Sequence, residues 1–479
     1  APGAGAAAGG RLPAGAAPRP APPPARPRGA PADLRFPAPP RGPGLAGPQR
    51  RWYRPTTVPP GDEMTSTAAA STTVPATGAP SGDPPPASGR AGFLAAGDTP
   101  FWLRVPEFRD RRTIDPGSAL ILLRPDDCAA VLRDARFTQW HMARVERNPQ
   151  IDPRFVERRR QAFLSMEGLD HLRLRRLAMV ALTPAAMNAQ RARMRAVMDR
   201  LIDPVIGAGR MDAVKDVIVH YPLPVICAVL GVPDEDIPFF ARTAEDWVRW
   251  MWGGPAAVPA ALAAHDAMDA YMTGLIARRA QALGDDVISG LIRAELEGDR
   301  LTREEGIHTA ASLIVPGLET TYSTLGSGLY LFTQHPEQWA LLARDPSLIP
   351  SAVEEILRFA PVGPTLERIA NEDAQVNGLH IARDTHVVLA LASVNRDPEL
   401  FPDPDRFDVT RTPQRGHMTF GGGRHLCLGM HMARAELQEG LGCLVRRLAR
   451  IELDGPVTWS APLGFQGPRA LPVRFTARA

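Results

Sequence analysis

The feature that most constrains the fold of this chain is a glycine-rich loop with one cysteine, at residues 420–429 (FGGGRHLCLG). A helical pattern follows at once, over residues 430–448. The glycines let backbone approach the sulfur of Cys427 closely, and N–H groups directed at that sulfur would stabilise a thiolate. Such a thiolate suits the axial ligand of one large metal-bearing cofactor. The alternative is a structural turn around a buried cysteine. That alternative would require the six specified positions of the loop to coincide by chance, which is rare at ordinary residue frequencies.

The first part of the chain differs in composition from the rest. Residues 1–90 hold 22 of the 50 prolines, and they carry 10 Arg against 4 Asp and Glu. A segment with so little periodic apolar surface cannot offset its ordering entropy, so we predict a disordered extension over residues 1–92. The first methionine is Met64, and we hypothesise that it is the native start. Mass spectrometry of the natively expressed protein tests this hypothesis.

Composition also bears on compartment and partners. The chain has no run of about twenty apolar residues, so no transmembrane helix is expected. The basic arm has neither interleaved aromatic residues nor an amphipathic face, so we expect no nucleic-acid or membrane partner. Four cysteines lie scattered without a CxxC pair, which argues against a disulfide scaffold or a zinc module. A cytoplasmic protein is the simplest interpretation, and Cys128, Cys227 and Cys443 are expected to be small core residues.

Helical periodicity dominates beyond residue 91. Apolar residues recur at helical spacing in segments 119–132, 173–187, 191–206, 212–230, 257–283 and 304–333. Thr302 is the expected N-cap of the last and longest segment. Short strands are expected at 374–381, 385–391 and 471–475, with a turn at Gly378. We therefore predict one large domain over residues 93–479, mainly α with small β sheets.

The cysteine loop resembles the haem-binding signature of the cytochrome P450 family, Phe-Gly-x-Gly-x-His/Arg-x-Cys-x-Gly, at every fixed position. The resemblance covers roughly residues 95–479. It implies a cytochrome P450-like fold and haem b, with the Cys427 thiolate as the ligand of the iron. It also implies that Phe420, Gly423 and Gly429 contact the cofactor.

A second resemblance involves the pair Glu355-x-x-Arg358, followed by the proline-rich segment 401–407. By itself, such a pair is most often an ordinary surface salt bridge one helical turn apart. In the family, the two residues and an arginine of the proline-rich segment form a buried network that supports the cysteine loop. Carried over by motif position, that arginine is Arg406.

A third resemblance lies inside the long helical segment, at residues 316–321 (PGLETT). It is similar to the family motif Ala/Gly-Gly-x-Glu/Asp-Thr, where the helix bends over the haem. On this match, Thr320 hydrogen-bonds the activated oxygen, Glu319 relays protons to it, and Gly317 leaves room for oxygen. Pro316 departs from the motif, and we expect it to sharpen the kink because proline lacks an N–H.

Four further residues match positions that bind the haem propionates in the family. His171 and Arg175 lie four residues apart and so share one helical face. Arg368 and His425 complete the set. Cationic and hydrogen-bonding side chains are the partners that carboxylates require.

The resemblance implies a monooxygenase that inserts one atom of dioxygen into a small, apolar organic substrate by hydroxylation or epoxidation. The chain carries no flavin or iron–sulfur motif, so electrons are expected from a ferredoxin with an NAD(P)H-dependent reductase. Docking contacts for such an acidic partner are expected at Arg173, Arg176 or Arg434, and a monomer is expected. Two alternatives stay open, oxidative coupling or ring formation on the same scaffold, and a haem protein without turnover. The substrate is expected to contact segments 139–148, 247–252 and 362–365, although the tryptophans of the second segment could equally pack in the core.

Overall fold

The computed structural model describes residues 100–115, 117–296, 302–314, 316–412, 416–460 and 464–478. The predicted disordered extension over residues 1–92, together with Met64, lies outside the described residues.

The described chain is mainly helical, as predicted. Its α-helices are α2 (Pro125–Arg133), α3 (Trp140–Glu146), α4 (Pro153–Gln161), α5 (Gly168–Ala181), α6 (Pro184–Ile202), α7 (Pro222–Leu230), α8 (Ile237–Gly253), α9 (Val258–Arg279), α10 (Val287–Leu296), α11 (Arg303–Ile314), α12 (Pro316–Gln334), α13 (Pro336–Arg344), α14 (Ile349–Phe359), α15 (Leu391–Val394) and α16 (Met430–Arg447). Helix α12 packs against α7, α14 and α16, and most of its side chains are buried. These helices form the centre of the main hydrophobic core.

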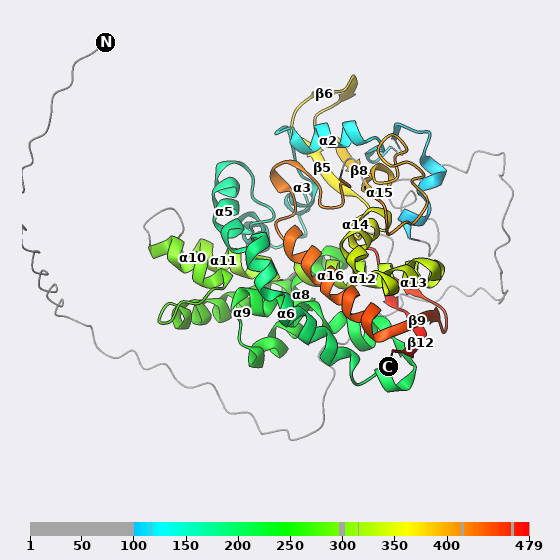
Figure 1. Cartoon of the computed structure of the whole chain (residues 1–479). Coiled ribbons are helices and arrows are strands. Elements are labelled where there is room, and N and C mark those ends of the chain that lie inside the picture. Colours follow the sequence, from blue (N-terminus) through cyan, green and yellow to red (C-terminus); the bar gives the residue numbers. More distant parts are fainter. Residues whose placement is uncertain are drawn as a thin grey trace, which may run out of the picture. The chain divides into compact units, whose positions relative to one another are not determined.

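The strands form small sheets, also as predicted. They are β1 (Thr113–Ile114), β2 (Leu120–Leu122), β3 (Phe137–Gln139), β4 (Arg210–Asp212), β5 (Leu366–Ala370), β6 (Ala374–Val376), β7 (Leu379–Ile381), β8 (His386–Leu389), β9 (Leu448–Leu453), β10 (Thr458–Trp459), β11 (Pro468–Ala470) and β12 (Pro472–Ala477). The five-stranded sheet has the order β1-β2-β8-β5-β3, with β2 and β8 parallel and its other neighbours antiparallel. Figure 1 shows this sheet and α2 on one side of α12 and α16, with α9, α10 and α11 on the other.

Several local predictions are confirmed. The Oγ1 of Thr302 accepts a hydrogen bond from the N–H of Glu305, and the Glu305 carboxylate accepts one from the N–H of Thr302, so α11 begins with a capping box. Strands β6 and β7 form a hairpin around Asn377 and Gly378, which both have positive φ, as a two-residue turn of this kind requires.

Two helix predictions in the first half are wrong in their boundaries. The segment 119–132 contains β2 followed by α2, because its apolar run pairs with β8 and Pro125 then starts a helix. The segment 173–187 is divided between α5 and α6, because Thr183 caps a new helix that has Pro184 at its first position.

The segment 212–230 is not one helix either. It contains a π-helical turn, η4 (Ala213–Val217), a 3₁₀ turn, η5 (Ile218–His220), and then α7, which Pro222 opens. Residues Ala213–Leu230 have a mean hydropathy of 1.6 and could span a membrane by length and composition, but 72% of this stretch is buried inside the protein. Burial of this extent is that of a core segment.

The predicted long helix over residues 304–333 is described as two helices. Helix α11 ends at Ile314, and α12 begins at Pro316. Residue 315, which separates the two ranges, lies outside the described residues, so the kink expected at Pro316 stays a prediction.

Candidate functional site

The cysteine loop leads directly into α16. The N–H of Cys427 donates to the carbonyl of Phe420 at 2.9 Å, and the N–H of Leu426 donates to the carbonyl of Gly423 at 3.2 Å. The second bond closes the 3₁₀ turn η9 (Gly423–His425). The loop thereby holds Cys427 immediately before the helix, as the sequence predicts.

Gly423 has the tightest surroundings of the loop. Its φ is +64°, and an added Cβ would lie 1.9 Å from the carbonyl oxygen of Leu132, at the end of α2. Since the obstacle is backbone, it cannot rotate away. Glycine at this position lets the loop and α2 approach each other.

Gly423→Ala should therefore prevent the loop from adopting this conformation and reduce haem bound per protein at least about tenfold, since both a backbone clash and a positive φ oppose alanine. Haem content of the purified protein measures the effect. Gly416→Ala is the matched control, because a Cβ at exposed Gly416 meets nothing within 4 Å. Equal haem content in both variants would contradict the assigned role of Gly423.

The surroundings of Cys427 favour the thiol until a metal cation is present. Burial raises the pKa of Cys427, and an N–H of Gly429 and the charges of Arg175 and Arg434 only partly offset it. A bound metal ion supplies the positive charge that favours a thiolate. The other cysteines, Cys128, Cys227 and Cys443, are fully buried, which confirms their predicted place in the core.

Two imidazoles lie together beside the loop. The rings of His171 on α5 and His425 on η9 stack with centroids 4.3 Å apart. His171 is buried, and its Nδ1 has no hydrogen-bond partner. Burial and the charges of His425 and Arg175 lower the pKa of His171 to about 4.

Two arginines complete the predicted set. Arg368 on β5 is buried, and within the described part of the chain it donates to two neutral acceptors, the Gln139 side chain at 3.0 Å and the Glu367 carbonyl at 2.8 Å. Burial lowers its pKa to about 10. Burial also lowers the pKa of Arg175, which the charge of Cys427 partly offsets. Buried Arg368, half-buried Arg175 and the His171 nitrogen that has no partner among the described residues fit a haem, because its two carboxylates need donors. Cys427 offers the ligand that its iron needs.

Glu167 lies among these groups, although no pattern in the sequence indicated it. Its carboxylate is 3.1 Å from His425 Nε2 and 3.4 Å from an Arg424 guanidinium nitrogen, and it accepts from the N–H of Gln139. Burial would raise the pKa of Glu167, but the bond to His425 and the charges of His425 and Arg424 keep it below its usual value. No motif includes this residue, since its partners come from distant parts of the chain.

The buried network that supports the cysteine loop, called the brace below, contains Glu355 and Arg358 of α14, as predicted. Arg358 Nε and Nη2 donate to the two Glu355 oxygens at 2.7 and 2.8 Å, and both residues are about 2% exposed. The N–H of Asp408 donates to Glu355 as well. The pair is thus a buried, bidentate one and not a surface salt bridge.

The prediction that the Arg406 side chain joins this network is wrong. That side chain is 67% exposed and lies 3.7 Å from Asp408, so Arg406 contributes only its carbonyl, which accepts from Arg358 Nη2 at 3.2 Å. The second guanidinium comes from Arg411, which is 12% exposed and lies 3.2 Å from Glu355. The physical reason is that Arg411 also donates to carbonyls of the surrounding loop, including that of Pro402 at 2.6 Å.

Asn395 connects the brace to the cysteine loop. Its carbonyl accepts from Arg358 Nη1 at 2.9 Å, and its side chain bonds the N–H of Met418 and the hydroxyl of Thr419, each at 2.8 Å. Met418 and Thr419 directly precede Phe420. The face of Phe420 lies against the Arg434 guanidinium, 4.6 Å from the ring centroid.

The distal motif lies at the start of α12. The Oγ1 of Thr320 donates to the carbonyl of Pro316 at 2.8 Å. Glu319 forms an ion pair with Arg469 of β11 at 2.7 Å, and Arg469 also donates to the Tyr322 hydroxyl at 2.8 Å. The sequence did not indicate Arg469 as the partner of Glu319. Roles of Glu319 and Thr320 in catalysis stay predictions.

Gly317 has space beside it. An added Cβ would lie 4.0 Å from the side chains of Ile226 and Met432, an ordinary contact distance. Packing alone therefore does not require glycine at this position. The oxygen groove at Pro316 and Gly317 stays a prediction.

Of the predicted substrate-contacting segments, 247–252 has two buried tryptophans, Trp247 and Trp250. Each belongs to a hydrophobic core cluster, so both pack in the interior. Two of the three predicted docking arginines are engaged, Arg173 with Glu305 and Arg434 with Glu354, whereas Arg176 is exposed.

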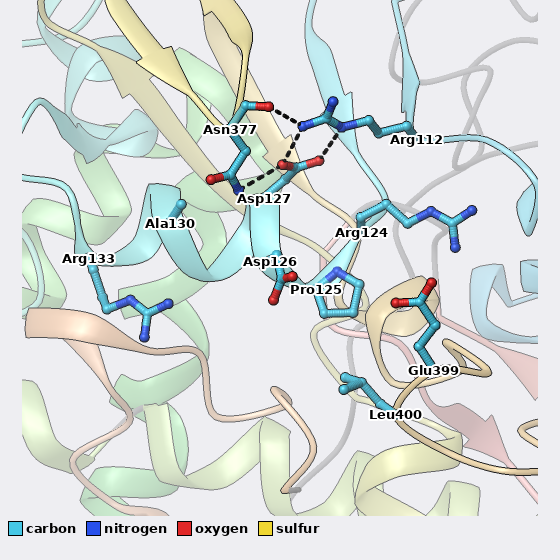
Figure 2. Close-up of a pocket in the computed structure, with 10 residues that line it drawn as sticks. All are labelled: Arg112, Arg124, Pro125, Asp126, Asp127, Ala130, Arg133, Asn377, Glu399 and Leu400. Atoms are coloured by element: carbon cyan, nitrogen blue, oxygen red, sulfur yellow. Dashed lines mark hydrogen bonds and ion pairs between the residues drawn. The ribbon is translucent and has the colours of Figure 1, made fainter.

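A pocket of about 870 Å³ lies along α2 (Figure 2). Its wall is charged, and Arg112 reaches across to Asp127, which also accepts from Asn377 (Figure 2). Arg124 pairs with Asp397 at 3.2 Å. Pockets for apolar organic molecules have mostly apolar walls, so this hollow differs in kind from a site of substrate oxidation.

A cysteine in a glycine-rich loop, together with cationic side chains that suit two carboxylates, fits the ligand set of a haem-thiolate protein. The Cytochrome P450 family model matches residues 347–455. Nocardicin C N-oxygenase of Nocardia uniformis subsp. tsuyamanensis is 35% identical over 399 residues, covering 80% of this chain and 96% of that protein. Mycinamicin IV hydroxylase/epoxidase of Micromonospora griseorubida is 37% identical over 368 residues, covering 74% and 89%.

The solved structures agree with these relatives. The crystal structure of P450BioI in complex with hexadec-9Z-enoic acid ligated acyl carrier protein superposes with a TM-score of 0.70 and 31% identity, covering 78% of this chain and 98% of that one. The chain therefore belongs to the cytochrome P450 family. It is a haem-thiolate monooxygenase of the bacterial type, an oxidoreductase similar to enzymes of secondary metabolism, and it works with an organic substrate and redox partners.

Proposed function

We propose that this protein uses haem b, held by Cys427 and by His171, Arg175, Arg368 and His425, to hydroxylate or epoxidise an apolar organic molecule. The observation that carries the proposal is the group of buried cationic and imidazole side chains beside Cys427. Haem with a thiolate ligand supplies the chemistry that cleaves the O–O bond of dioxygen.

The chain's own residues have separate tasks in this proposal. The cations would bind the two propionates and orient the cofactor, and the loop would hold Cys427 as the ligand of its iron. Thr320 positions a proton near the oxygen-binding side, and Glu319 takes protons from solvent and passes them on. The ion pair with Arg469 supports a gating role for Glu319, because a carboxylate must leave that pair to reach inward.

Electrons are proposed to come from a ferredoxin and an NAD(P)H-dependent reductase. The exposed Arg176 on α5 is the predicted docking contact whose side chain is available for an acidic partner. We further propose a monomer in the cytoplasm.

The ferrous–CO difference spectrum of the purified holoenzyme tests the proposed ligation. We expect the Soret band at the long wavelength typical of thiolate-ligated haem, and its loss in Cys427→Ser. Folded, haem-containing wild type without that band would overturn the proposal. Formation of an oxygenated product coupled to NAD(P)H consumption then separates oxygen insertion from oxidative coupling and from ligand binding without turnover.

A further inference from the structure

A buried arginine without a carboxylate partner lies on α4. Arg159 is 7% exposed, and its Nη2 donates to the Ser165 hydroxyl at 3.1 Å. Its Nε has no hydrogen-bond partner. Among the residues that the structure describes, no Asp or Glu forms an ion pair or hydrogen bond with Arg159.

This isolation is unusual when Arg159 is compared with its neighbours. Arg158 forms an ion pair with Asp269 of α9, and exposed Arg160 pairs with Glu146 at 2.9 Å. Two arginines of the polar pocket also have acidic partners, Arg112 with Asp127 (Figure 2) and Arg124 with Asp397. A buried charge is costly unless an opposite charge or several hydrogen bonds compensate it, so Arg159 lacks an anion.

The guanidinium lies against one ring of an aromatic cluster. It lies over the ring of Trp250 on α8, 4.9 Å from the centroid. Phe155, one turn earlier on α4, contacts Trp250 at 5.3 Å and the ring of His265 at 6.1 Å between centroids. An apolar body with an anionic end would match both the aromatic wall and the cation.

His265 is a second unsatisfied polar group in this place. It is 2% exposed, its Nε2 has no partner, and its ring lies 3.8 Å from that of Trp247. Burial and the charges of Arg159 and Arg158 lower its pKa to about 2, so it is neutral and able to donate one hydrogen bond. Arg159 and His265 together provide charge and donors for one carboxylate.

The cluster adjoins the proposed haem site. The Ser165 hydroxyl that accepts from Arg159 also lies 3.0 Å from His141 Nε2. Burial and the charges of Arg159, Arg368 and His425 lower the pKa of His141 to about 3. Asp269 pairs with both Arg158 and His308 of α11, the helix that precedes the distal motif.

The haem carboxylates already have their own set of donors. His171, Arg175, Arg368 and His425 provide four side chains for two propionates, which leaves Arg159 as a cation for another anion. We propose that Arg159, with His265, binds the carboxylate of the substrate, which is an organic acid with an apolar body. This inference rests on the proposed function and names the substrate class of the same site.

Matched acids and amides test the inference on the holoenzyme. Tetradecanoic acid and tetradecanamide form one pair, and 4-phenylbutanoic acid and 4-phenylbutanamide form another. Spectral titration of the haem gives a Kd for each. We expect the wild type to bind at least one acid about tenfold or more tightly than its amide, since a bond to a charged group contributes more than a neutral one.

Arg159→Met should bring the ratio of the two dissociation constants near one while keeping the apolar stem in place. Arg160→Met, on the same helix and with the same change of charge, should keep the wild-type ratio. Arg159→Lys should retain a reduced preference for the acid. An unchanged ratio in Arg159→Met, or no preference for either acid in the wild type, overturns the proposal.

Haem content shows whether Arg159 binds the carboxylate of the substrate or a propionate of the haem. If Arg159 binds a propionate, Arg159→Met loses haem and its remaining holoenzyme keeps the preference for acid, which also overturns the proposal. The ferrous–CO band of the same preparations reports separately on thiolate ligation. A normal band without any acid preference sinks the inference about Arg159 and leaves the proposed function intact.

Discussion

Glu355→Ala is expected to lower the free energy of unfolding by about 3–5 kcal/mol and to remove most of the bound haem. The carboxylate of Glu355 accepts both Arg358 nitrogens at 2.7 and 2.8 Å, and both side chains are inaccessible to water. Its removal leaves the Arg358 guanidinium buried without its anion. Arg358→Ala is expected to act similarly, since it strands the Glu355 carboxylate. Chemical denaturation and haem content measure both variants.

The brace offers a sharp internal control. Arg411→Ala removes a guanidinium that lies 3.2 Å from Glu355, so it should also destabilise the protein. Arg406→Ala removes a largely exposed side chain and should change stability by no more than about 0.5 kcal/mol. A larger loss in Arg406→Ala than in Arg411→Ala would contradict the described network, and full haem content in Glu355→Ala would contradict its supporting role.

This pair of arginines also shows where sequence reasoning ends. The helical pair Glu355 and Arg358 could be predicted because residues three apart on a helix face each other. The third member lies in an irregular loop, in which Asp403 has a positive φ. No periodicity decides whether Arg406 or Arg411 turns inward from such a loop. The carbonyls that accept from Arg411 are positioned by the backbone conformation of the folded loop.

The boundaries of helices and strands could likewise be predicted where they depend on neighbouring residues, and not where they depend on distant ones. The N-cap at Thr302 and the turn at Gly378 are local, and the sequence predicts both. The helix prediction over residues 119–132 misses β2, because the apolar run of β2 pairs in parallel with β8, more than 250 residues later in the chain.

Arg159 could not be recognised from the sequence, since it is the middle residue of three consecutive arginines. Only the tertiary packing separates them. One pairs with Asp269, one faces solvent, and Arg159 is buried against Trp250. A charge run that is ordinarily a solvated helix face thus supplies an isolated buried cation.

The distal hydroxyl has a matched control one turn along α12. The Oγ1 of Thr320 donates to the carbonyl of Pro316 at 2.8 Å, and that of Thr324 donates to the carbonyl of Thr320 at 2.7 Å. Valine replaces either threonine with nearly the same shape. Thr320→Val and Thr324→Val therefore each lose one hydrogen bond from a hydroxyl to a helix carbonyl. Only Thr320→Val also removes the hydroxyl that is proposed to position a proton.

Thr320→Val is expected to lower product formed per NAD(P)H consumed about tenfold or more, since positioned proton transfer contributes about 10²–10⁴-fold to rates. Dioxygen that takes two electrons and two protons without insertion leaves as hydrogen peroxide, so peroxide should rise in proportion. Thr324→Val should keep the wild-type ratio of product to peroxide, with a small loss of stability. Glu319→Gln should slow oxygen consumption, because its amide cannot exchange protons as a carboxyl does. Equal coupling in Thr320→Val and Thr324→Val would refute the role proposed for the Thr320 hydroxyl, whatever the total rate.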